Sequence, residues 1–388
     1  MLKEMRQKSE AEIIASTHIG IIGGGQLGLM LAEAARAMGF AAITVLDPTP
    51  DCPASAVAEQ IVGSLKDPGA IRELAKRADV LTYEIEHISV PALQALLDTG
   101  QVIHPAPALL AIIQNKFRQK KFLSERRIPV APFLSVGSRA DIEQAAERLG
   151  YPLVLKAQKD AYDGRGNARI NGPEDIDTGL AKLEARELYV EKGLKLEKEL
   201  GVMIGRNEQG QIVTYPVVEM IHARDICQEV LAPAAIPTEL QLEAQEIARK
   251  AIGYLQGVGI FGVELFLDSA EKLWLNEIAP RPHNLGHYTI EACATSQFEQ
   301  HLRAVTGLHL GLTTLRYAAA VMINVLGERN GPAQPSLPAE YDHEHVFIHL
   351  YGKHETKIDR KMGHITVVGD DLASVYQEAK EMRAALSI

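Results

Sequence analysis

Residues 18–47 read HIGIIGGGQLGLMLAEAARAMGFAAITVLD. The apolar run at 18–23 predicts a strand, and a glycine-rich turn follows it at 23–28. Residues 29–38 are rich in Ala, Leu and Met, which favours a helix, and residues 42–46 predict the next strand. A strand, a helix and a strand in this order predict parallel pairing, so we expect an α/β protein with α+β character in part.

The rest of the chain divides into parts whose composition differs. Residues 1–17 predict a frayed or helical extension with no assigned role. A Rossmann-like parallel-sheet domain is expected over 18–108, a larger α/β domain over 109–310, and a small β-rich C-terminal domain over 311–388. Further strands are predicted at 80–83, 152–156, 187–192, 199–205, 211–219, 261–267, 272–278, 319–326, 346–350 and 364–368, and further helices at 91–97, 109–127, 239–256, 298–305 and 371–385.

The composition limits the possible functions. The chain has 388 residues, of which 46% are apolar and 23% charged, so we expect about two or three soluble domains. The net charge of −10 argues against a general nucleic-acid binder, which would need a basic face. Cys52, Cys227 and Cys293 lie far apart without metal-ligand spacing, which fits a reducing cytoplasm. The longest apolar runs fall short of the roughly 18 residues of a membrane span.

The pattern Gly23-x-Gly25-x-x-Gly28 lies between the predicted strand and helix, as a dinucleotide-binding turn does. Asp47 follows about 20 residues later, where a ribose-binding acid is expected in that fold. The same turn can hold another phosphate group at the helix N-terminus, and Asp47 can simply begin a turn before Pro48. A different phosphate ligand is favoured over a nicotinamide cofactor, and a purely structural turn is the third interpretation.

Glu264 and Glu277 are predicted to face each other across a hairpin. A loop at 269–272 would place Asp268 opposite Leu273. Four further steps along each strand bring the two glutamates together, with Cβ atoms roughly 5 Å apart. Two carboxylates among apolar residues are unfavourable unless a cation lies between them, and Mg²⁺ bridging phosphate oxygens fits, with Mn²⁺ as a possible substitute. The alternative is a pair of exposed glutamates on a solvated face.

Residues 276–287 read NEIAPRPHNLGH and place an amide, a carboxylate, a guanidinium and two imidazoles at the end of a predicted strand. Scaffolds commonly present reactive groups at such positions. The carboxylate suits a hard metal, and Arg281 suits a phosphate or a carboxylate. Strict alternation places Asn276 on the opposite face from Glu277, so a site that uses both would need a twist or a bulge.

The segment 162–167, YDGRGN, has glycines on both sides of Arg165. Such a loop can close over a polyphosphate, with backbone N–H groups and the guanidinium neutralising charge. Lys156 ends the preceding strand within reach of phosphate oxygens. The alternatives are an ordinary surface turn for the loop and a solvated helix face for Lys116.

Several motifs follow one another in a fixed order: GGGQLG at 23–28, YEIE at 83–86, YDGRG at 162–166, YVEK at 189–192, NE at 276–277, APRPHN at 279–284 and RKMGH at 360–364. In this order they resemble the ATP-grasp superfamily and, within it, the N5-carboxyaminoimidazole ribonucleotide synthetase family, also called phosphoribosylaminoimidazole carboxylase ATPase subunits. The resemblance covers about residues 18–370. It implies an ATP-grasp domain at 109–310 with a mobile lid over about 150–195.

The resemblance also implies a reaction. ATP phosphorylates bicarbonate to carboxyphosphate, and the amine of 5-aminoimidazole ribonucleotide captures the carboxyl group, in purine biosynthesis. Phosphoryl transfer depends chiefly on positioning and charge neutralisation, so carboxylates that hold Mg²⁺ and cationic side chains suffice. A cytoplasmic homodimer is implied, with neither a nucleic acid nor a membrane as partner.

Roles are carried over where the motifs match. Glu264 and Glu277, with Asn276 near, should hold the metal. The backbone of the strand at 189–192 should read the adenine edge. Further ATP contacts are implied for Lys116, Lys156, Tyr162, Gly164, Gly166, Glu191, Lys192, Leu194, Glu199 and His222.

The acceptor site is implied in the same way. Gly25, Gln26 and Gly28 should bind the ribonucleotide rather than NAD. Glu84 or Glu86 should accept a hydrogen bond from its amine, and the choice between them is open. The residues implied to line the carboxyl and acceptor site are Tyr162, Asp163, Arg165, Arg281, His283 and Asn284. Those implied to bind the 5′-phosphate are Lys353, Arg360 and Lys361.

Two positions depart from the family pattern, since Ala161 stands where glycine is common and Leu285 where serine is common. Neither removes a charged group, so the expected reaction is unchanged. The nearest alternative is another ATP-grasp ligase, such as a formate-dependent glycinamide ribonucleotide transformylase. If the protein were an NAD oxidoreductase, the paired glutamates would have no function in the reaction. The presence of Lys156 and Arg165 argues against a third alternative, a catalytically inactive nucleotide-binding subunit.

Overall fold

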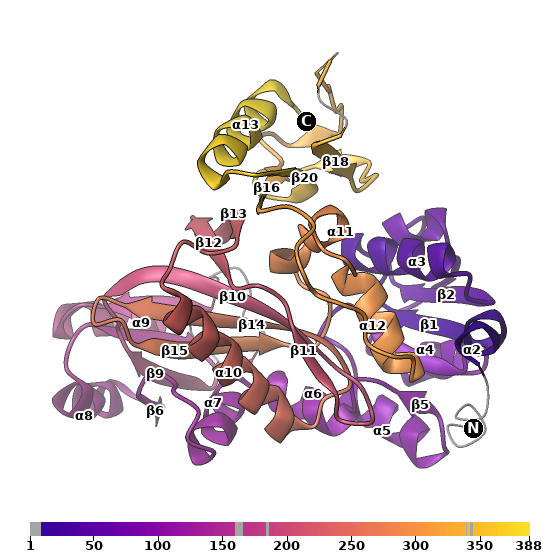
Figure 1. Ribbon diagram of the computed structural model, residues 1–388. Helices are drawn as coiled ribbons and strands as arrows, with labels where there is room; N and C mark the ends of the chain where they lie inside the picture. Colours follow the sequence, from indigo (N-terminus) through magenta and orange to yellow (C-terminus); the bar gives the residue numbers. More distant parts are fainter. Residues whose placement is uncertain (1–8, 160–165, 184–185, 339, 342–343) are drawn as a thin grey trace.

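The computed structural model describes residues 9–159, 166–183, 186–338, 340–341 and 344–388 of the chain. In Figure 1 the N-terminal part lies at the right, the central part at the lower left and the C-terminal part at the top. The predicted α/β class is confirmed, because a parallel sheet with helices opens the chain and sheets with packed helices follow it.

The first sheet is parallel, with the strand order β3-β2-β1-β4-β5. Its strands β1 and β4 are apolar, so they occupy the centre, where both faces are covered. Ile21 packs with helix α3 on one face, and Ile22 packs with α4 and α5 on the other. The elements are β1 (His18–Ile22), α3 (Gln26–Met38), β2 (Ala42–Asp47), β3 (Glu59–Val62), α4 (Pro68–Ala75), β4 (Val80–Tyr83), α5 (Val90–Asp98) and β5 (Val102–Ile103).

The glycine-rich turn is tighter than predicted, because α3 begins at Gln26 rather than at residue 29. Gly25 is the N-cap residue, and Gly23 has a φ of 101°, which favours glycine. A Cβ on Gly28 would lie 2.5 Å from the carbonyl oxygen of Gly23, so the helix approaches the turn as closely as glycine allows.

Part of the predicted N-terminal extension forms helix α2 (Glu10–Ser16). The Glu12 N–H donates to Ser9 Oγ (3.3 Å) and the Ser9 N–H donates to Glu12 Oε2 (2.8 Å), which is a capping box. Ile13 is buried in the core that α3 shares, so α2 is anchored on the first sheet.

The single helix predicted over 109–127 is wrong, since α6 (Pro107–Ile113) and α7 (Lys116–Glu125) are separate. Asn115 begins α7 as its N-cap by accepting a hydrogen bond from the Arg118 N–H at 2.8 Å. The Lys116 N–H donates to the Gln158 carbonyl (2.8 Å), so α7 starts against the strand that precedes residue 160.

A smaller antiparallel sheet has the order β6-β9-β7-β8. Helices α8 and α9 cover it through buried residues such as Ile142 and Ile176. Its elements are β6 (Phe133–Val136), α8 (Arg139–Leu149), β7 (Leu153–Ala157), β8 (Asn167–Ile170), α9 (Ile176–Lys182) and β9 (Leu188–Lys192).

The largest sheet is antiparallel, in the order β15-β14-β10-β12-β13-β16-β20-β18, with β11 also paired to β10. Helix α10 lies in the predicted region and packs on it with Ala244, Ile247 and Ala251 at helical spacing. The elements of its first half are β10 (Leu196–Arg206), β11 (Ile212–Thr214), β12 (Val218–Ala223), β13 (Ile226–Ala232), α10 (Thr238–Leu255), β14 (Gly259–Asp268) and β15 (Leu273–Ala279). The single strand predicted over 211–219 is wrong, because Pro216, which lacks an N–H, separates β11 from β12.

The C-terminal strands continue this sheet, since β16 pairs with β13. Strands β16 (Ala319–Leu326) and β18 (Val346–Leu350) have the predicted bounds, and β20 (Lys361–Gly369) is longer than predicted. The remaining elements are α11 (Thr289–Ala292), α12 (Gln297–Thr306), β17 (Gly331–Pro332), β19 (Glu355–Thr356), α13 (Leu372–Ala385) and the short 3₁₀ turns η1 (Pro53–Ala56), η2 (Pro173–Asp175) and η3 (Asn284–Gly286).

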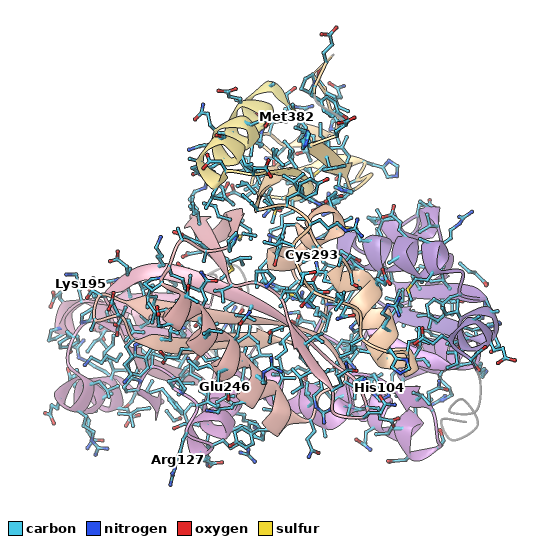
Figure 2. All side chains as sticks on the ribbon, viewed as in Figure 1. His104, Arg127, Lys195, Glu246, Cys293 and Met382 are labelled. Carbon is cyan, nitrogen blue, oxygen red and sulfur yellow. The ribbon has the colours of Figure 1, made fainter. Side chains whose placement is uncertain are left out.

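Side chains fill the space between these layers (Figure 2). The buried Cys293 lies between the C-terminal strands and the helices below them, whereas Arg127, Lys195 and Glu246 are exposed. Within the part of the chain that the structure describes, every helix is too short or too polar to cross a bilayer.

Candidate functional site

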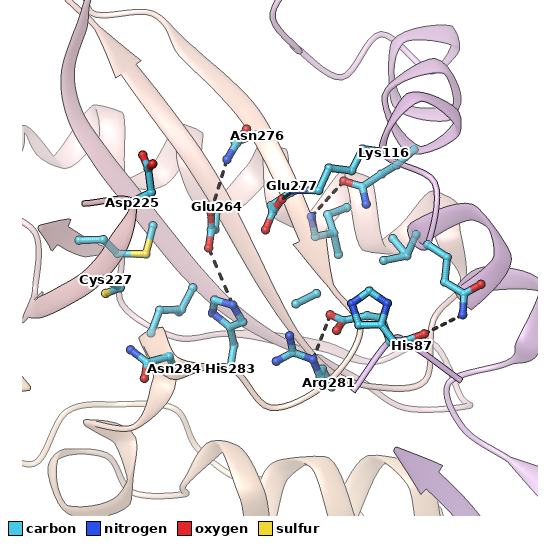
Figure 3. A pocket seen from close by; sticks show the side chains of 18 of the residues that line it. His87, Lys116, Asp225, Cys227, Glu264, Asn276, Glu277, Arg281, His283 and Asn284 are labelled. Carbon is cyan, nitrogen blue, oxygen red and sulfur yellow. Dashed lines mark hydrogen bonds and ion pairs between the residues drawn. The ribbon is translucent and has the colours of Figure 1, made fainter. Parts of the chain in front are cut away.

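A cavity of about 530 Å³ opens where the first sheet, the smaller sheet and the largest sheet meet. Figure 3 shows its polar lining, in which Glu264, Glu277, Arg281 and His283 point toward a common space. The predicted site residues that line it are Glu86, Lys116, Lys156, Glu199, His222, Glu264, Asn276, Glu277, Arg281, His283, Asn284 and Lys361.

Glu264 and Glu277 are opposite each other, as predicted, although the predicted register at the turn is wrong. Leu273 pairs with Leu267, not with Asp268, and a bulge at Asn276 then restores the expected partner of Glu264. The bulge turns the Asn276 amide toward Glu264, to which its Nδ2 donates at 3.4 Å.

The two glutamates have opposite electrostatic surroundings. Burial, with the nearby Glu277 charge, raises the pKa of Glu264 to about 7. The ammonium of Lys116 donates to Glu277 Oε2 at 2.6 Å and lowers the pKa of Glu277 to about 2. Among the described residues, clusters of three or more His, Cys, Asp or Glu with metal-binding geometry are absent, so a cation here would take further ligands from a substrate or water.

A buried ion-pair cluster surrounds Glu191 on β9. Lys156 Nζ lies 3.2 Å from Glu191 Oε2, and Lys120 Nζ lies 3.2 Å from Oε1. Burial lowers the pKa of Lys120 despite this partner. The Glu191 side chain therefore holds Lys156 rather than facing the cavity, while Lys192 is exposed and Leu194 is half-buried outside the lining.

Glu199 on β10 and His222 on β12 lie side by side, because their strands are neighbours. His222 Nδ1 is 3.1 Å from Glu199 Oε2. Burial would lower the pKa of His222, but the hydrogen bond and charge of Glu199 outweigh it, so the pKa is raised. The pair forms a polar wall beside the carboxylates.

Arg281 faces the first sheet. Its Nε lies 2.9 Å from Glu86 Oε1. Glu84 is buried next to this pair, and its Oε1 accepts a hydrogen bond from the Gly25 N–H at 3.0 Å. Burial raises the pKa of Glu84 to about 7, although Arg281 and the Gly25 N–H act against this. Glu84 therefore lies between the glycine turn and Arg281, and neither Glu84 nor Gly25 lines the cavity.

His283 lies between these groups, with Nε2 3.8 Å from Glu264 Oε1. Burial and the nearby Arg281 charge lower the pKa of His283 to about 3, so the ring is neutral. Asn284 lies beside it, near Cys227 (Figure 3). Leu285 is buried against Gly201 and packs in the core of the largest sheet, which accounts for an apolar residue at this position.

Three basic residues of the C-terminal part, Lys353, Arg360 and Lys361, lie near one another, and Lys353 is close enough to Glu84 to feel its charge. Lys353 Nζ donates to the Lys361 carbonyl at 2.7 Å. Burial, with the Arg360 charge, lowers the pKa of Lys353 to about 8, and Glu84 acts against this. Lys361 lines the cavity, whereas Lys353 and Arg360 lie outside its lining.

Some predicted residues are not tested by this geometry. Tyr162, Asp163, Gly164 and Arg165 lie outside the described residues, and so does Ala161. Gly166 begins the next described segment, where its carbonyl accepts from the Ala157 N–H at 2.9 Å. Gln26 and Gly28 belong to the first turn of α3 and do not line the cavity.

Several lining residues were not found from the sequence, among them Lys66, His87, Gln119, Lys159, Asp225 and Cys227, whereas Asn167 ends the predicted loop at 162–167. Gln119 Oε1 accepts from the Ile278 N–H at 3.1 Å, next to Glu277. It follows Lys116 by one helical turn, as Lys120 does. Helical spacing from Lys116 could therefore have indicated that both residues lie near the site.

Comparisons with known proteins match successive regions of the chain. Residues 16–114 match the ribonucleotide synthetase preATP-grasp domain, and residues 121–298 match the ATP-grasp domain. Residues 320–378 match the phosphoribosylaminoimidazole carboxylase C-terminal domain.

The chain is 39% identical over 378 residues to the N5-carboxyaminoimidazole ribonucleotide synthase of Synechococcus elongatus, covering 95% of this chain and 94% of that protein. It is 44% identical over 368 residues to the phosphoribosylaminoimidazole carboxylase of Ogataea methanolica, covering 92% of this chain and 67% of that protein. The chain spans about two thirds of the length of the relatives with the latter name.

Solved structures agree with these matches. The N5-carboxyaminoimidazole ribonucleotide synthetase of Thermotoga maritima is 45% identical, with a TM-score of 0.86 over 96% of this chain and 99% of that one. The Aspergillus clavatus synthase, solved with ADP and 5-aminoimidazole ribonucleotide, is 36% identical, with a TM-score of 0.86 over 95% of this chain and 98% of that one.

Proposed function

The chain belongs to the N5-carboxyaminoimidazole ribonucleotide synthetase family of ATP-grasp enzymes, and on this premise we propose that it carboxylates 5-aminoimidazole ribonucleotide with ATP and bicarbonate in purine biosynthesis. The γ-phosphoryl group of ATP passes to a bicarbonate oxygen, which gives carboxyphosphate and ADP. The amine of the ribonucleotide then attacks the carboxyl carbon, phosphate leaves with the bonding electron pair, and the amine loses a proton.

One observation carries the proposal: a single cavity joins paired carboxylates and lysines on one side to an arginine–carboxylate pair on the other. Glu277 with Lys116 provides the first set, and Arg281 with Glu86 provides the second. Phosphoryl transfer needs the first set, and holding a small anion beside an amine needs the second. Because both sets of residues line the same cavity, the phosphoryl transfer and the carboxyl transfer can follow each other there.

The carboxylate pair fits Mg²⁺. Glu264 and Glu277 are half-buried and opposed, and the pKa of Glu264 is raised by burial and by the Glu277 charge, which a cation would offset. Mg²⁺ is usually held by one or two carboxylates together with phosphate oxygens, so these residues with Asn276 suffice. When bound, the ion would neutralise charge that develops on the transferred phosphoryl group.

ATP is assigned to the region between the smaller and largest sheets. We assign the ATP phosphates to Lys116 and Lys156, which both line the cavity, and Glu191 orients Lys156 through their 3.2 Å ion pair. Glu199 with His222 is assigned the ribose hydroxyls, and the backbone of β9 the adenine. Gly166 and Gly164 with Tyr162 are assigned phosphate contacts of the loop, as the family resemblance implies.

The acceptor is assigned to the side of Arg281. Glu86 lines the cavity and pairs with Arg281 through one oxygen, so its other oxygen can accept from an amine, whereas Glu84 is buried outside the lining and accepts from the Gly25 N–H. We assign binding of the ribonucleotide to the turn at Gly25, Gln26 and Gly28. Its 5′-phosphate is assigned to Lys353, Arg360 and Lys361. His283 and Asn284, with Asp163 and Arg165 of the loop, are assigned the carboxyl group.

A phosphate-release assay tests the proposal. Purified protein with Mg²⁺ and ATP should release phosphate in a manner that depends on both bicarbonate and 5-aminoimidazole ribonucleotide. Dependence on formate and glycinamide ribonucleotide instead would favour the alternative transformylase. A homodimer that acts in the cytoplasm completes the proposal, and sedimentation analysis tests the assembly.

A further inference from the structure

Gln297 is the first residue of α12, and its side chain is fully buried behind the cavity wall. Its Oε1 accepts a hydrogen bond from the His283 N–H at 2.8 Å, and its Nε2 donates to the His283 carbonyl at 2.8 Å. One side-chain amide thus pairs with both backbone groups of His283, as a neighbouring strand would. This contact fixes the backbone of the residue whose ring faces Glu264.

The orientation of the Gln297 amide is set by a third contact. Its Nε2 lies 3.1 Å from Nδ1 of His287. Burial lowers the pKa of His287 well below its ordinary value, so the ring is neutral and Nδ1 can accept. The Gln297 N–H donates to Thr289 Oγ1 at 2.8 Å, and this hydroxyl donates to the Gly286 carbonyl at 2.6 Å. The loop from His283 to Thr289 is therefore folded around the end of α12.

His283 is also confined from the side of β14. A Cβ on Gly262 would lie 2.8 Å from the Cβ of His283, so the strand and the loop are in close contact. With Gly262 on one side and Gln297 on the other, the ring is directed toward Glu264, 3.8 Å away. Removing the amide would release the restraint on one side of His283.

We propose that Gln297 is a positioning residue for carboxyl transfer, which it serves by holding His283 against Glu264 and Arg281 without touching a substrate. This inference rests on the proposed function. The amide contacts the loop of the acceptor side, whereas Lys116 and Lys156 on the ATP side are held by Glu277 and Glu191. Its loss should therefore slow the reaction more than it weakens ATP binding.

Gln300 provides a matched control on the same helix. It is also fully buried, its Oε1 accepts from the Gly311 N–H at 2.8 Å, and its Nε2 donates to the Gly311 carbonyl at 3.0 Å. The contact is of the same kind as that of Gln297, but Gly311 does not line the cavity. Comparable losses of stability are therefore expected from the two positions, with a different effect on turnover.

The test compares Gln297→Met with Gln300→Met, since Met keeps the length and removes every hydrogen bond of the side-chain amide. Both variants should lower the thermal midpoint, and Gln297→Met should also lower kcat about tenfold or more, as expected when a group near the reaction is misplaced. Its KM for ATP should stay within about twofold of wild type, because the lysines are unaffected. Gln297→Glu keeps the shape of the side chain and the oxygen that accepts from the His283 N–H, and its protonated form restores a donor. It should therefore be more active than Gln297→Met, and its activity relative to Gln297→Met should rise as pH falls.

Equal kcat values for the two Met variants, or a KM for ATP that rises as much as kcat falls, would overturn the positioning role. A Gln297→Glu variant no more active than Gln297→Met at any pH would also overturn it. Failure of the proposed function has a separate signature: the wild-type enzyme would release no phosphate in response to bicarbonate and the ribonucleotide.

Discussion

Glu264 and Glu277 lie directly opposite each other on the β14–β15 hairpin, because a bulge at Asn276 shifts the register by one residue. Without the bulge, the register of Leu265 with Leu275 would put Asn276 opposite Glu264 and leave Glu277 on the other face of the hairpin. With it, Asn276 Nδ2 donates to Glu264 at 3.4 Å, and the carboxylates and the amide face one cavity. The irregularity in the strand therefore builds the candidate metal site.

Replacing Glu277 tests this site. Glu277→Gln keeps the shape and removes the charge that Lys116 and a cation would share. We expect kcat to fall about 100-fold or more, comparable to the loss of one group that stabilises the transition state. Glu271→Gln, at the exposed tip of the same hairpin, should be as active as wild type. Wild-type turnover by Glu277→Gln at saturating Mg²⁺ would contradict the metal role.

The affinity for Mg²⁺ should depend on pH through Glu264. Its pKa is about 7 in the metal-free site, so a proton competes with the cation below that pH and has left above it. We therefore expect the Mg²⁺ affinity, measured by titration with a non-hydrolysable ATP analogue, to rise between pH 6 and pH 8 and then level off, roughly as the carboxyl titrates. Glu264→Gln should bind more weakly and lose this dependence, and an unchanged pH profile in the variant would argue against Glu264 as the ligand.

Arg281 should matter for carboxyl transfer more than for the nucleotide. Arg281→Ala removes the partner of Glu86, 2.9 Å away, whereas Lys156 on the ATP side pairs with Glu191. We expect kcat to fall about 100-fold with the ATP dissociation constant within about threefold of wild type. Calorimetry with the ATP analogue measures the dissociation constant. If ATP affinity falls as much as kcat does, Arg281 contacts the nucleotide instead.

Lys120 should contribute mainly to stability. Lys120→Met leaves one oxygen of the buried Glu191 without its cation, although Lys156 still pairs with the other. We expect the free energy of unfolding in urea to fall by about 2 kcal/mol, below the usual cost of breaking a buried pair completely. Lys121→Met, the exposed neighbour on α7, should change it by less than about 0.5 kcal/mol. Equal losses of unfolding free energy in the two variants would show that the ion pair with Glu191 is not the cause.

Lys353 should give ribonucleotide binding an alkaline limit. Burial and Arg360 lower its pKa to about 8, so the ammonium is charged below that pH and neutral above it. We expect the KM for 5-aminoimidazole ribonucleotide to rise as pH increases from 7 to 9, because a neutral amine attracts a phosphate less, by up to about tenfold. Lys353→Arg keeps its charge throughout and should flatten the profile, whereas an equally steep rise in that variant would exclude Lys353 as the cause.

The sequence predicted elements best where apolar runs are bounded by turns. Strands β4, β16 and β18 have the predicted bounds for this reason. The bulge at Asn276 could not be placed, because strand periodicity does not tell where an extra residue enters. The predicted pairing of Glu264 was right even though Asp268 was misplaced, since the bulge compensates for the error at the turn.

Residues whose partners lie far away in the sequence were harder to find. Lys120 on helix α7 depends on Glu191 of strand β9, and Gln297 depends on the fold of the loop at His283, so neither has a local pattern that indicates its role. Asp47 shows the opposite difficulty. It resembles a ribose-binding acid, but its carboxylate accepts from the Gly24 and Thr49 N–H groups at 2.8 Å and shapes the turn.

We propose that one cavity couples ATP cleavage to carboxylation of an aminoimidazole ribonucleotide. This coupling is measured as the rate of phosphate release from ATP with Mg²⁺, with bicarbonate and 5-aminoimidazole ribonucleotide added singly and together, alongside isotope transfer from labelled bicarbonate. We expect fast phosphate release when both substrates are present, with the label in the ribonucleotide product. Release that needs formate, or that is equally fast without the ribonucleotide and leaves it unlabelled, would rule out the coupling.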